Sequence, residues 1–390
     1  MPSPLLITRD EPFLALLDRH RGAREVALDC EFHGEKRYRP TLYLVQIGYA
    51  EEALAVDPER VDLRPLRAVL EDASIRKVFH AGREDIRLLA RATGATEFRG
   101  IFDTQIAAAF LGHGLSIGYA RLVKELLGVE LDKSSQFTDW SRELTNEQID
   151  YALNDVRFLP RVTAHLVSEL ERRERLAWAL DAALSMSRAA LAPPDRTKLY
   201  RKISGFASLG PTELGTLREL AIWRDSIAET ENCRPEGVAS DAGLRQLALR
   251  PPTKYGQLRG MRGVGMGGSE RWWSGLVAAV ARGLAEPEPV QVLVEPDPRA
   301  ESIAALLGVI RRVVATSNDV AAELLASSAD LRALAEWQLA GSAEPSPVVE
   351  VLSGWRRPLI GAPLLDTLAG DISVKIAPAS EAGLELVHRR

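Results

Sequence analysis

Apolar and polar residues follow two different rhythms along the first half of this chain. Short apolar runs, typical of buried strands, occupy residues 25–32, 42–49 and 54–56. Apolar residues three or four positions apart, typical of amphipathic helices, occupy residues 63–72, 85–93 and 103–111. From residue 116 onward nearly all of the pattern is helical. We therefore predict an α/β sheet with helices on both faces, followed by all-α domains.

Prolines and glycines mark the expected domain boundaries. Pro193 and Pro194 close the first region, and Gly210 and Pro211 open a second one. A later stretch rich in proline and acidic residues is typical of a semi-rigid linker. We predict a first domain over residues 1–195, a helical domain over 205–285, a linker over 286–298 and a second helical domain over 299–385.

The composition is that of an ordinary globular protein. Of its 390 residues 46% are hydrophobic and 26% are charged, and its only cysteines are Cys30 and Cys233. Two cysteines outside any C-x-x-C pair cannot build a disulfide framework, which fits a reducing cytoplasm. The N-terminus lacks the basic and apolar segments of a signal peptide, and no apolar run is long enough to cross a membrane. We expect a cytoplasmic protein.

The net charge of −5 argues at first against a nucleic-acid partner. Whole-chain charge is a poor guide, however, where catalytic carboxylates are neutralised by metal. A basic stretch in the middle of the chain is either a surface that tracks phosphates or a solvated helix face. Its members are Arg172, Arg173, Arg175, Arg188, Arg196, Lys198, Arg201 and Lys202.

Four carboxylates and one tyrosine are the candidate functional residues. Asp29 and Glu31 follow an apolar run, and side chains two apart on a strand point to the same face. Asp85 follows a second apolar stretch. Tyr151 and Asp155 are four residues apart, so one face of a helix carries both. An unpaired charge next to a buried strand is costly, so these carboxylates need a partner.

Divalent cations would be that partner. Carboxylates that converge repel one another and resist ionisation, whereas Mg²⁺ and Mn²⁺ prefer hard oxygen ligands. Two such ions ~3.5–4 Å apart can activate a water molecule and stabilise the leaving oxygen of a phosphodiester. The sequence therefore predicts a two-metal nuclease, in which the four carboxylates are the ligands.

The text around these residues resembles ribonuclease D, a family of 3′→5′ exoribonucleases in the DEDD superfamily. Three motifs carry the resemblance, and they occur in family order and at family spacing. They read LDCEF at residues 28–32, VFHAGREDI at 78–86 and LTNEQIDYALNDV at 144–156. The tyrosine of the third motif, where other members carry histidine, indicates the DEDDy branch. The resemblance implies a ribonuclease H-like fold.

The resemblance also implies a role at each matching position. Asp29, Glu31 and Asp155 would hold the ion that activates water. Asp29 and Asp85 would hold the ion on the leaving-group side. Tyr151 would orient the attacking water. All five motif residues are therefore candidate catalytic residues.

Four further residues near the motifs are candidates either for a structural role or for a contact with the substrate. Cys30 stands where the family commonly has threonine, and strand alternation should turn it away from the metals. Asp103 precedes a predicted helix and fits an N-cap better than a fifth ligand. His80 either contacts the terminal nucleotide or is a satisfied histidine near the end of the sheet. Gln46 shares a strand face with Leu44 and Gly48 and is a candidate for the substrate cleft.

Residues 205–285 resemble the HRDC domain, a small helical module found in ribonuclease D and in some DNA helicases. We expect the second helical domain, at 299–385, to be HRDC-like as well. The matching text is LRELAIWRD at 217–225, VASD at 238–241, RPPT at 250–253 and LRGMRGV at 258–264. Glycine amides at 263–268 could cradle a phosphate, with Arg259, Arg262 and Arg271 as candidate nucleic-acid contacts. Helical spacing predicts that Trp223 packs in the core instead.

We predict a metal-dependent 3′→5′ exoribonuclease that removes single nucleotides and releases nucleoside 5′-monophosphates. The resemblance implies tRNA precursors or other small structured RNAs with single-stranded 3′ ends as substrates, and we expect a monomer without a membrane partner. Two alternatives stay open: the same chemistry on DNA, and a nucleic-acid-binding scaffold with a vestigial catalytic centre. A serine hydrolase based on the G-x-S-x-G match at Ser116 is disfavoured, because no strand precedes that segment.

Overall fold

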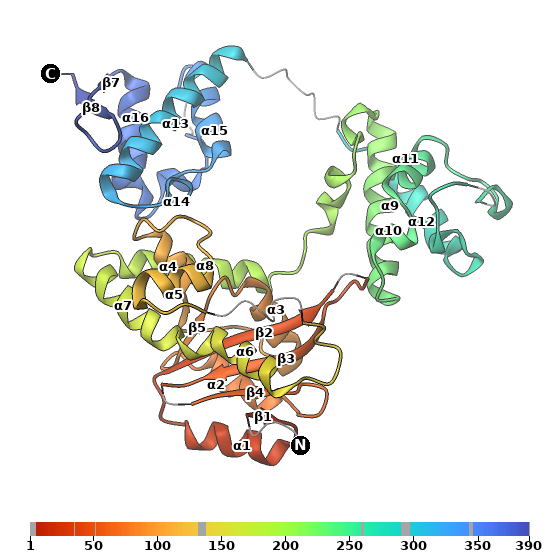
Figure 1. The fold of residues 1–390 in the computed structure, drawn as a ribbon. Coiled ribbons are helices and arrows are strands. Elements are labelled where there is room, and N and C mark those ends of the chain that lie inside the picture. Colours follow the sequence, from red (N-terminus) through yellow and green to blue (C-terminus); the bar gives the residue numbers. More distant parts are fainter. Residues whose placement is uncertain are drawn as a thin grey trace. The chain divides into compact units, whose positions relative to one another are not determined.

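The described part of the chain forms two compact units (Figure 1). In the computed structural model the described residues are 5–34, 36–50, 52–131, 138–258, 261–289, 297–342 and 346–389. The first unit comprises Met1–Glu31, Leu42–Leu191 and Pro296–Arg390, and the second comprises Phe32–Thr41 and Ala192–Glu295. No helix in the described ranges is long and apolar enough to cross a membrane.

A mixed six-stranded sheet forms the centre of the first unit, in the order β1-β4-β3-β2-β5-β6. β2, β5 and β6 are parallel, β1 is parallel to β4, and β3 is antiparallel to β4. The three predicted strands are confirmed as β2, β3 and β4. β5 coincides with the apolar stretch before Asp85, and β1 and β6 were not predicted. The strands are β1 (Leu6–Ile7), β2 (Glu25–His33), β3 (Thr41–Gly48), β4 (Ala53–Val56), β5 (Arg76–Phe79) and β6 (Ile101–Asp103).

Helices flank this sheet, as the periodicity predicts. The predicted helices at 85–93 and 103–111 are α3 and α4, but the stretch 63–72 is only a 3₁₀ turn followed by one short helix. Ser116 lies in the loop before α5, which begins at Tyr119. The helices are α1 (Asp10–Arg19), η1 (Arg64–Leu66), α2 (Arg67–Glu71), α3 (Arg83–Thr93), α4 (Thr104–Ala109), α5 (Tyr119–Leu127), α6 (Asn146–Arg157), α7 (Leu159–Arg172) and α8 (Leu176–Leu191).

The C-terminal region packs into the same core as the sheet. Its buried residues Leu307, Ile310 and Leu364 belong to one hydrophobic cluster with Ala27 and Phe102 of the strands. The expectation of helices alone is wrong at the end of the chain, where β7 and β8 pair as an antiparallel hairpin. The elements are α13 (Pro298–Asn318), α14 (Ala322–Leu325), α15 (Ser328–Leu339), η7 (Glu350–Leu352), the π-helix η8 (Arg357–Gly361), α16 (Ala362–Ala369), β7 (Ile372–Ile376) and β8 (Leu384–His388).

The second unit is helical and has a core of its own. Trp223 is buried there with Leu220, Leu244 and Leu276, which confirms its predicted packing role. The glycine-rich segment makes a close backbone contact, since a Cβ on Gly243 would collide with the Gly263 carbonyl. The elements are η2 (Arg196–Lys202), η3 (Phe206–Ser208), α9 (Pro211–Thr230), α10 (Pro235–Val238), α11 (Asp241–Leu249), η4 (Tyr255–Leu258), η5 (Met266–Gly268), η6 (Glu270–Trp272) and α12 (Trp273–Ala285).

Candidate active site

The first two carboxylates are placed by β2, which lies in the middle of the sheet between β3 and β5. The preceding residues Val26 and Leu28 are fully buried, so the strand itself is fixed by core packing. Asp29 and Glu31 are two residues apart on this strand and therefore point to the same face. Both side chains are partly exposed, so a ligand can reach them from solvent.

Asp85 is placed by the first turn of α3, which starts just after β5. Free backbone N–H groups give a helix N-terminus a partial positive charge, which favours a carboxylate there. Only 7% of the Asp85 surface is exposed. The turn that leads into α3 is held by Asp103, whose carboxylate accepts from the Gly82 N–H at 2.9 Å. The strand end and the helix start together fix this carboxylate at the edge of the sheet.

Asp155 and Tyr151 are placed by α6, which starts with a capping box. Thr145 accepts from the Gln148 N–H at 3.3 Å, while the Gln148 side chain accepts from the Thr145 N–H at 2.9 Å. Near its other end the helix approaches the sheet closely, because Gly48 has no side chain. A Cβ there would lie 3.0 Å from the Val156 Cβ. This close approach carries Asp155 toward the carboxylates of β2.

The structure brings three of the four carboxylates into one cluster. One oxygen from each of Asp29, Glu31 and Asp155 lies within 4.8 Å of the other two. Asp85 is not part of this set of three, but its charge affects Asp29. Burial raises the pKa of Asp29 well above its usual value, and the charges of Asp85, Asp155 and Glu31 raise it further. Tyr151 is half-buried one turn before Asp155 on the same helix. The five motif residues thus come from three elements that meet beside β2.

All four carboxylates are held in a form that resists ionisation. Burial raises the pKa of Glu31 to about 8, helped by the charges of Asp155 and Asp85. Burial also raises the pKa of Asp85 to about 7 and that of Asp155 to about 6. Within the described residues, no Lys, Arg or His forms an ion pair with any of the four. The cluster therefore lacks positive charge, and a divalent cation with oxygen ligands would supply it.

Cys30 is closer to the carboxylates than strand alternation predicts. Its thiol is buried and hydrogen-bonds to Asp85, and burial together with the Asp85 charge raises the pKa of the thiol. The expectation that this side chain is turned away from the metal ligands is therefore wrong for Asp85. Alternation turns Cys30 away from Asp29 and Glu31 on its own strand, but Asp85 comes from α3 and is not bound by that alternation.

Asp103 and His80 have structural contacts. Asp103 is the N-cap of α4, and its carboxylate accepts from the N–H groups of Gln105 at 2.9 Å and Ile106 at 3.1 Å. This confirms the predicted N-cap. Both ring nitrogens of His80 have partners: Nδ1 lies 2.9 Å from the Thr104 hydroxyl and Nε2 lies 3.0 Å from the Ile117 carbonyl. The contacts favour the interpretation of His80 as a satisfied histidine.

The remaining predicted nucleic-acid contacts fall into different environments. Gln46 is completely buried, and neither its amide nitrogen nor its oxygen has a hydrogen-bond partner within the described residues. It therefore presents no surface to a substrate. In the second unit Arg262 is exposed, and Arg271 lies over the Trp272 ring and pairs with Glu231 at 3.0 Å. Arg259 lies outside the described residues.

Most of the basic stretch is occupied by contacts within the protein. Arg172 pairs with Glu169 at 2.6 Å, and Arg173 pairs with Asp319 at 2.6 Å. Arg175 donates to backbone carbonyls, and Arg196 pairs with acidic residues of α9. These contacts favour the structural interpretation of the stretch over a surface that tracks phosphates.

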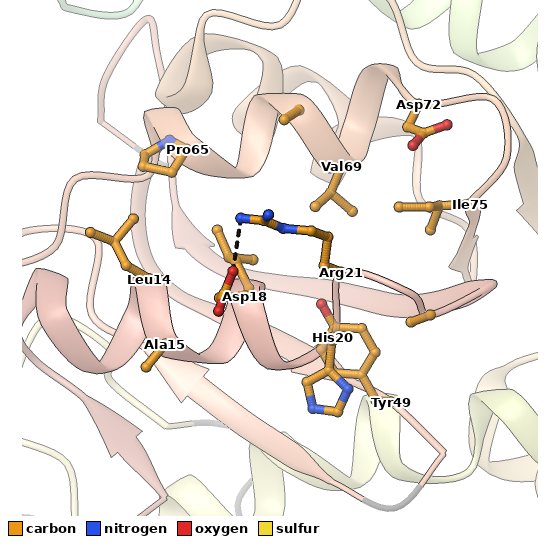
Figure 2. Close-up of a pocket in the computed structure, with 13 residues that line it drawn as sticks. Leu14, Ala15, Asp18, His20, Arg21, Tyr49, Pro65, Val69, Asp72 and Ile75 are labelled. Carbon is orange, nitrogen blue, oxygen red and sulfur yellow. Dashed lines mark ion pairs between the residues drawn. The ribbon is translucent and has the colours of Figure 1, made fainter.

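A cavity of about 620 Å³ lies elsewhere in the first unit, between α1 and α2. Figure 2 shows its apolar wall, with Leu14, Val69 and Ile75, and the Arg21–Asp18 ion pair of 2.8 Å that crosses it. No motif carboxylate lines this cavity. The carboxylate cluster is thus a separate site on the sheet.

Comparisons with known proteins agree with this geometry. Residues 5–171 match a 3′-5′ exonuclease family model, and residues 213–280 match the HRDC domain model. Ribonuclease D of Gluconacetobacter diazotrophicus is 36% identical, over 92% of this chain and 91% of that protein. Ribonuclease D of Granulibacter bethesdensis is 34% identical, over 96% and 95%. The crystal structure of Escherichia coli RNase D, described as an exoribonuclease involved in structured RNA processing, has a TM-score of 0.80 and 30% identity, covering 95% of this chain and 99% of that one.

The mixed sheet, its flanking helices and the carboxylate cluster define a 3′→5′ exonuclease of ribonuclease H-like fold, followed by an HRDC domain. The extent of the matches identifies the family more narrowly. The chain belongs to the ribonuclease D family, and it is a hydrolytic 3′→5′ exoribonuclease.

Proposed function

We propose that the carboxylate cluster holds two divalent cations, Mg²⁺ or Mn²⁺. Asp29, Glu31 and Asp155 would hold one, and Asp29 and Asp85 the other. The observation that carries this proposal is the convergence of carboxylate oxygens within 4.8 Å without a basic partner among the described residues. When bound, the ions would lower the pKa of a water molecule and stabilise the charge on the leaving oxygen.

The residues of the chain would position the attack on the last phosphodiester. Tyr151, one turn before Asp155, would orient the attacking water by a hydrogen bond. The water oxygen bonds to phosphorus, and the bond to the 3′-oxygen of the penultimate nucleotide breaks. That oxygen takes up a proton and becomes the new RNA 3′ end, while the phosphate stays on the 5′ side of the released nucleotide. The product is a nucleoside 5′-monophosphate.

The substrates would be tRNA precursors and other small structured RNAs with a single-stranded 3′ end, bound by a monomer. The description of the Escherichia coli relative, which processes structured RNA, supports this substrate class. The HRDC domain would contribute phosphate contacts through Arg262 and Arg271 and stacking through Trp272, whose side chain is partly exposed. Arg259 would contribute as well.

The test uses a 5′-labelled single-stranded RNA with Mg²⁺. We expect a ladder of one-nucleotide steps that EDTA abolishes, that Asp29→Ala slows by more than about 100-fold, and that Tyr151→Phe weakens. Asp150→Ala is the matched control. Asp150 lies on α6 next to Tyr151, but it is exposed and pairs only with Arg157 in the described structure. Internal cuts, or full activity of Asp29→Ala, would contradict the site.

The same assay separates the alternatives. A matched DNA oligonucleotide that is degraded as fast as the RNA would point to a DNA exonuclease. RNA binding with no cleavage in any metal would point to a scaffold.

A further inference from the structure

At the junction of α6 and α7, a tyrosine side chain makes the hydrogen bond that a backbone N–H would make in a continuous helix. α6 ends at Arg157, α7 begins at Leu159, and Phe158 lies between them. In a continuous helix the Phe158 N–H would bond to the Asn154 carbonyl. Instead that N–H is directed to the Val156 carbonyl. The Asn154 carbonyl accepts from the hydroxyl of Tyr119 at 3.1 Å.

The sequence explains why the helix breaks there. Pro160 is in the first turn of α7 and has no N–H to give to the Val156 carbonyl. Its ring would also collide with that carbonyl in a continuous helix. A break of this kind leaves backbone groups without partners and leaves the angle between the two helices undefined. Tyr119 satisfies one of these groups, because its hydroxyl donates to the Asn154 carbonyl.

Tyr119 is itself held in place by the sheet. It is the first residue of α5, and the Ile117 carbonyl just before it accepts from Gln105 Nε2 at 3.0 Å and contacts His80 Nε2 at 3.0 Å. The His80 and Tyr119 rings lie 5.4 Å apart, tilted by 55°. His80 follows β5 directly. A continuous set of contacts therefore runs from the end of β5 to the last turn of α6.

We propose that Tyr119 is a positioning residue of the exonuclease site. Its hydroxyl fixes the last turn of α6 through the Asn154 carbonyl, and so fixes Asp155, which is the next residue in the chain. This inference rests on the proposed function, since it assigns Asp155 to the metal cluster. It concerns a residue outside the three motifs, and it does not place Tyr119 in contact with substrate.

Two observations support the assignment. Burial raises the pKa of the Tyr119 hydroxyl, and the charge of Asp155 is the next contribution, so the hydroxyl lies near that carboxylate and stays a neutral donor. Tyr119 is partly buried against the hydrophobic core, so its ring has little freedom to move.

The test is Tyr119→Phe, which removes only the hydroxyl. We expect kcat on a single-stranded RNA to fall roughly 10- to 100-fold with the KM for RNA unchanged, because Asp155 is displaced while the RNA contacts remain. Mn²⁺ binding, measured by calorimetry without RNA, should weaken about tenfold. The matched control is Tyr49→Phe, which removes the hydroxyl of a buried tyrosine elsewhere in the same unit and should leave kcat and Mn²⁺ affinity unchanged.

Each outcome decides between possibilities. A Tyr119→Phe protein with wild-type kcat and Mn²⁺ affinity would overturn the proposal. So would a variant whose kcat, KM and melting temperature all change together, because the hydroxyl would then only stabilise the fold. If Asp29→Ala stays active in the same series, the proposed metal site fails and the Tyr119 proposal fails with it. If Asp29→Ala is inactive while Tyr119→Phe behaves like the wild type, the Tyr119 proposal alone fails.

Discussion

The helices at 298–369 and those at 211–285 both bury apolar residues, but they bury them against different partners. The C-terminal helices share one hydrophobic cluster with the sheet of the exonuclease domain. The HRDC helices bury their apolar faces against one another in a separate cluster. A helical module at the end of a chain can thus be part of the catalytic fold or an independent unit, depending on where its apolar face finds a partner.

Specific polar contacts join the C-terminal helices to the exonuclease domain. Arg175 donates to the Phe110 carbonyl at 2.9 Å and to the carbonyls of Asn318 and Asp319 at 2.6 and 3.2 Å. The Ala321 N–H donates to the Ala109 carbonyl at 2.9 Å. One arginine thus ties the end of α4 to the end of α13.

An aromatic group completes this junction. The rings of Trp178 and Trp355 stack with centroids 5.2 Å apart, and Phe110 packs edge-on against Trp355 at 5.1 Å. Arg356 lies over the Trp355 ring at 4.4 Å. Pairs of this kind add to the free energy gained from burial alone.

The HRDC unit is held by contacts within itself. Arg224 is buried and donates to the Ala239 carbonyl at 3.1 Å and to Asp241 at 2.7 Å. These bonds join α9 to the start of α11. The unit has no need of the sheet for its core, so we expect it to unfold separately.

The largest expected effect is in the HRDC core. Trp223→Ala should lower the free energy of unfolding of the HRDC unit by about 3–5 kcal/mol, because a large buried ring is removed. Calorimetry should show the HRDC transition at lower temperature and the exonuclease transition unchanged. Activity on a short unstructured RNA should be retained. A shift of both transitions together would contradict the independence of the unit.

The next expected effect is a dependence of stability on pH that differs between the two units. The pKa values of Glu31 and Asp85, about 8 and about 7, lie above those of an unfolded chain. Their protonated forms stabilise the fold below the unfolded pKa, and this stabilisation is lost as pH rises through the folded pKa values.

Without metal, the exonuclease transition should therefore lose on the order of a few kcal/mol between about pH 5 and pH 8. Added Mn²⁺ should restore it at high pH, whereas the HRDC transition should not respond to the metal. Melting curves with EDTA and with Mn²⁺ at several pH values measure both. An HRDC response to Mn²⁺ equal to that of the exonuclease unit would contradict the assignment.

A smaller effect is expected at the C-terminal junction. Trp355→Ala should destabilise the first unit by about 3 kcal/mol, because the ring is only partly buried. The exonuclease transition should shift and the HRDC transition should not. If a third transition appeared instead, the C-terminal helices would be a separate domain and the comparison would fail.

The smallest effect is expected at Arg175. Arg175→Ala should cost about 2 kcal/mol, because backbone carbonyls of Phe110 and Asn318 lose a donor. Arg172→Ala is the matched control, since its exposed pair with Glu169 should contribute less than about 0.5 kcal/mol. Urea titrations followed by tryptophan fluorescence measure both changes. Equal effects at the two positions would show that Arg175 does not anchor the C-terminal helices.

The candidate site residues could be located in the sequence because the motifs are local. Asp29 and Glu31 follow a buried strand, and Tyr151 and Asp155 share a helix face, so short stretches of sequence define their orientation. The strand β6 has three residues and β1 has two, which is too short for a periodic pattern. The contact of Cys30 with Asp85 was mispredicted because it depends on where α3 packs.

Contacts between distant segments outside the three motifs could not be predicted from the sequence. The bonds from Arg175 to Asn318 join residues 143 positions apart, and no local pattern reports them. The contact of Tyr119 with Asn154 spans 35 positions and depends on the break at Pro160. Gln46 lies on the expected strand, but its burial results from the packing of the whole sheet.

The central claim, two cations on the four carboxylates, is tested most directly by counting the Mn²⁺ ions bound to each chain. Calorimetric titration of the metal-free protein should give two sites. Asp29→Asn should lose both sites and Asp85→Asn one of them, because Asp29 would contact both ions. Glu84→Gln, an exposed neighbour of Asp85 that pairs with Arg87, should keep two. A single site in the wild-type protein, or two sites in Asp29→Asn, would contradict the account.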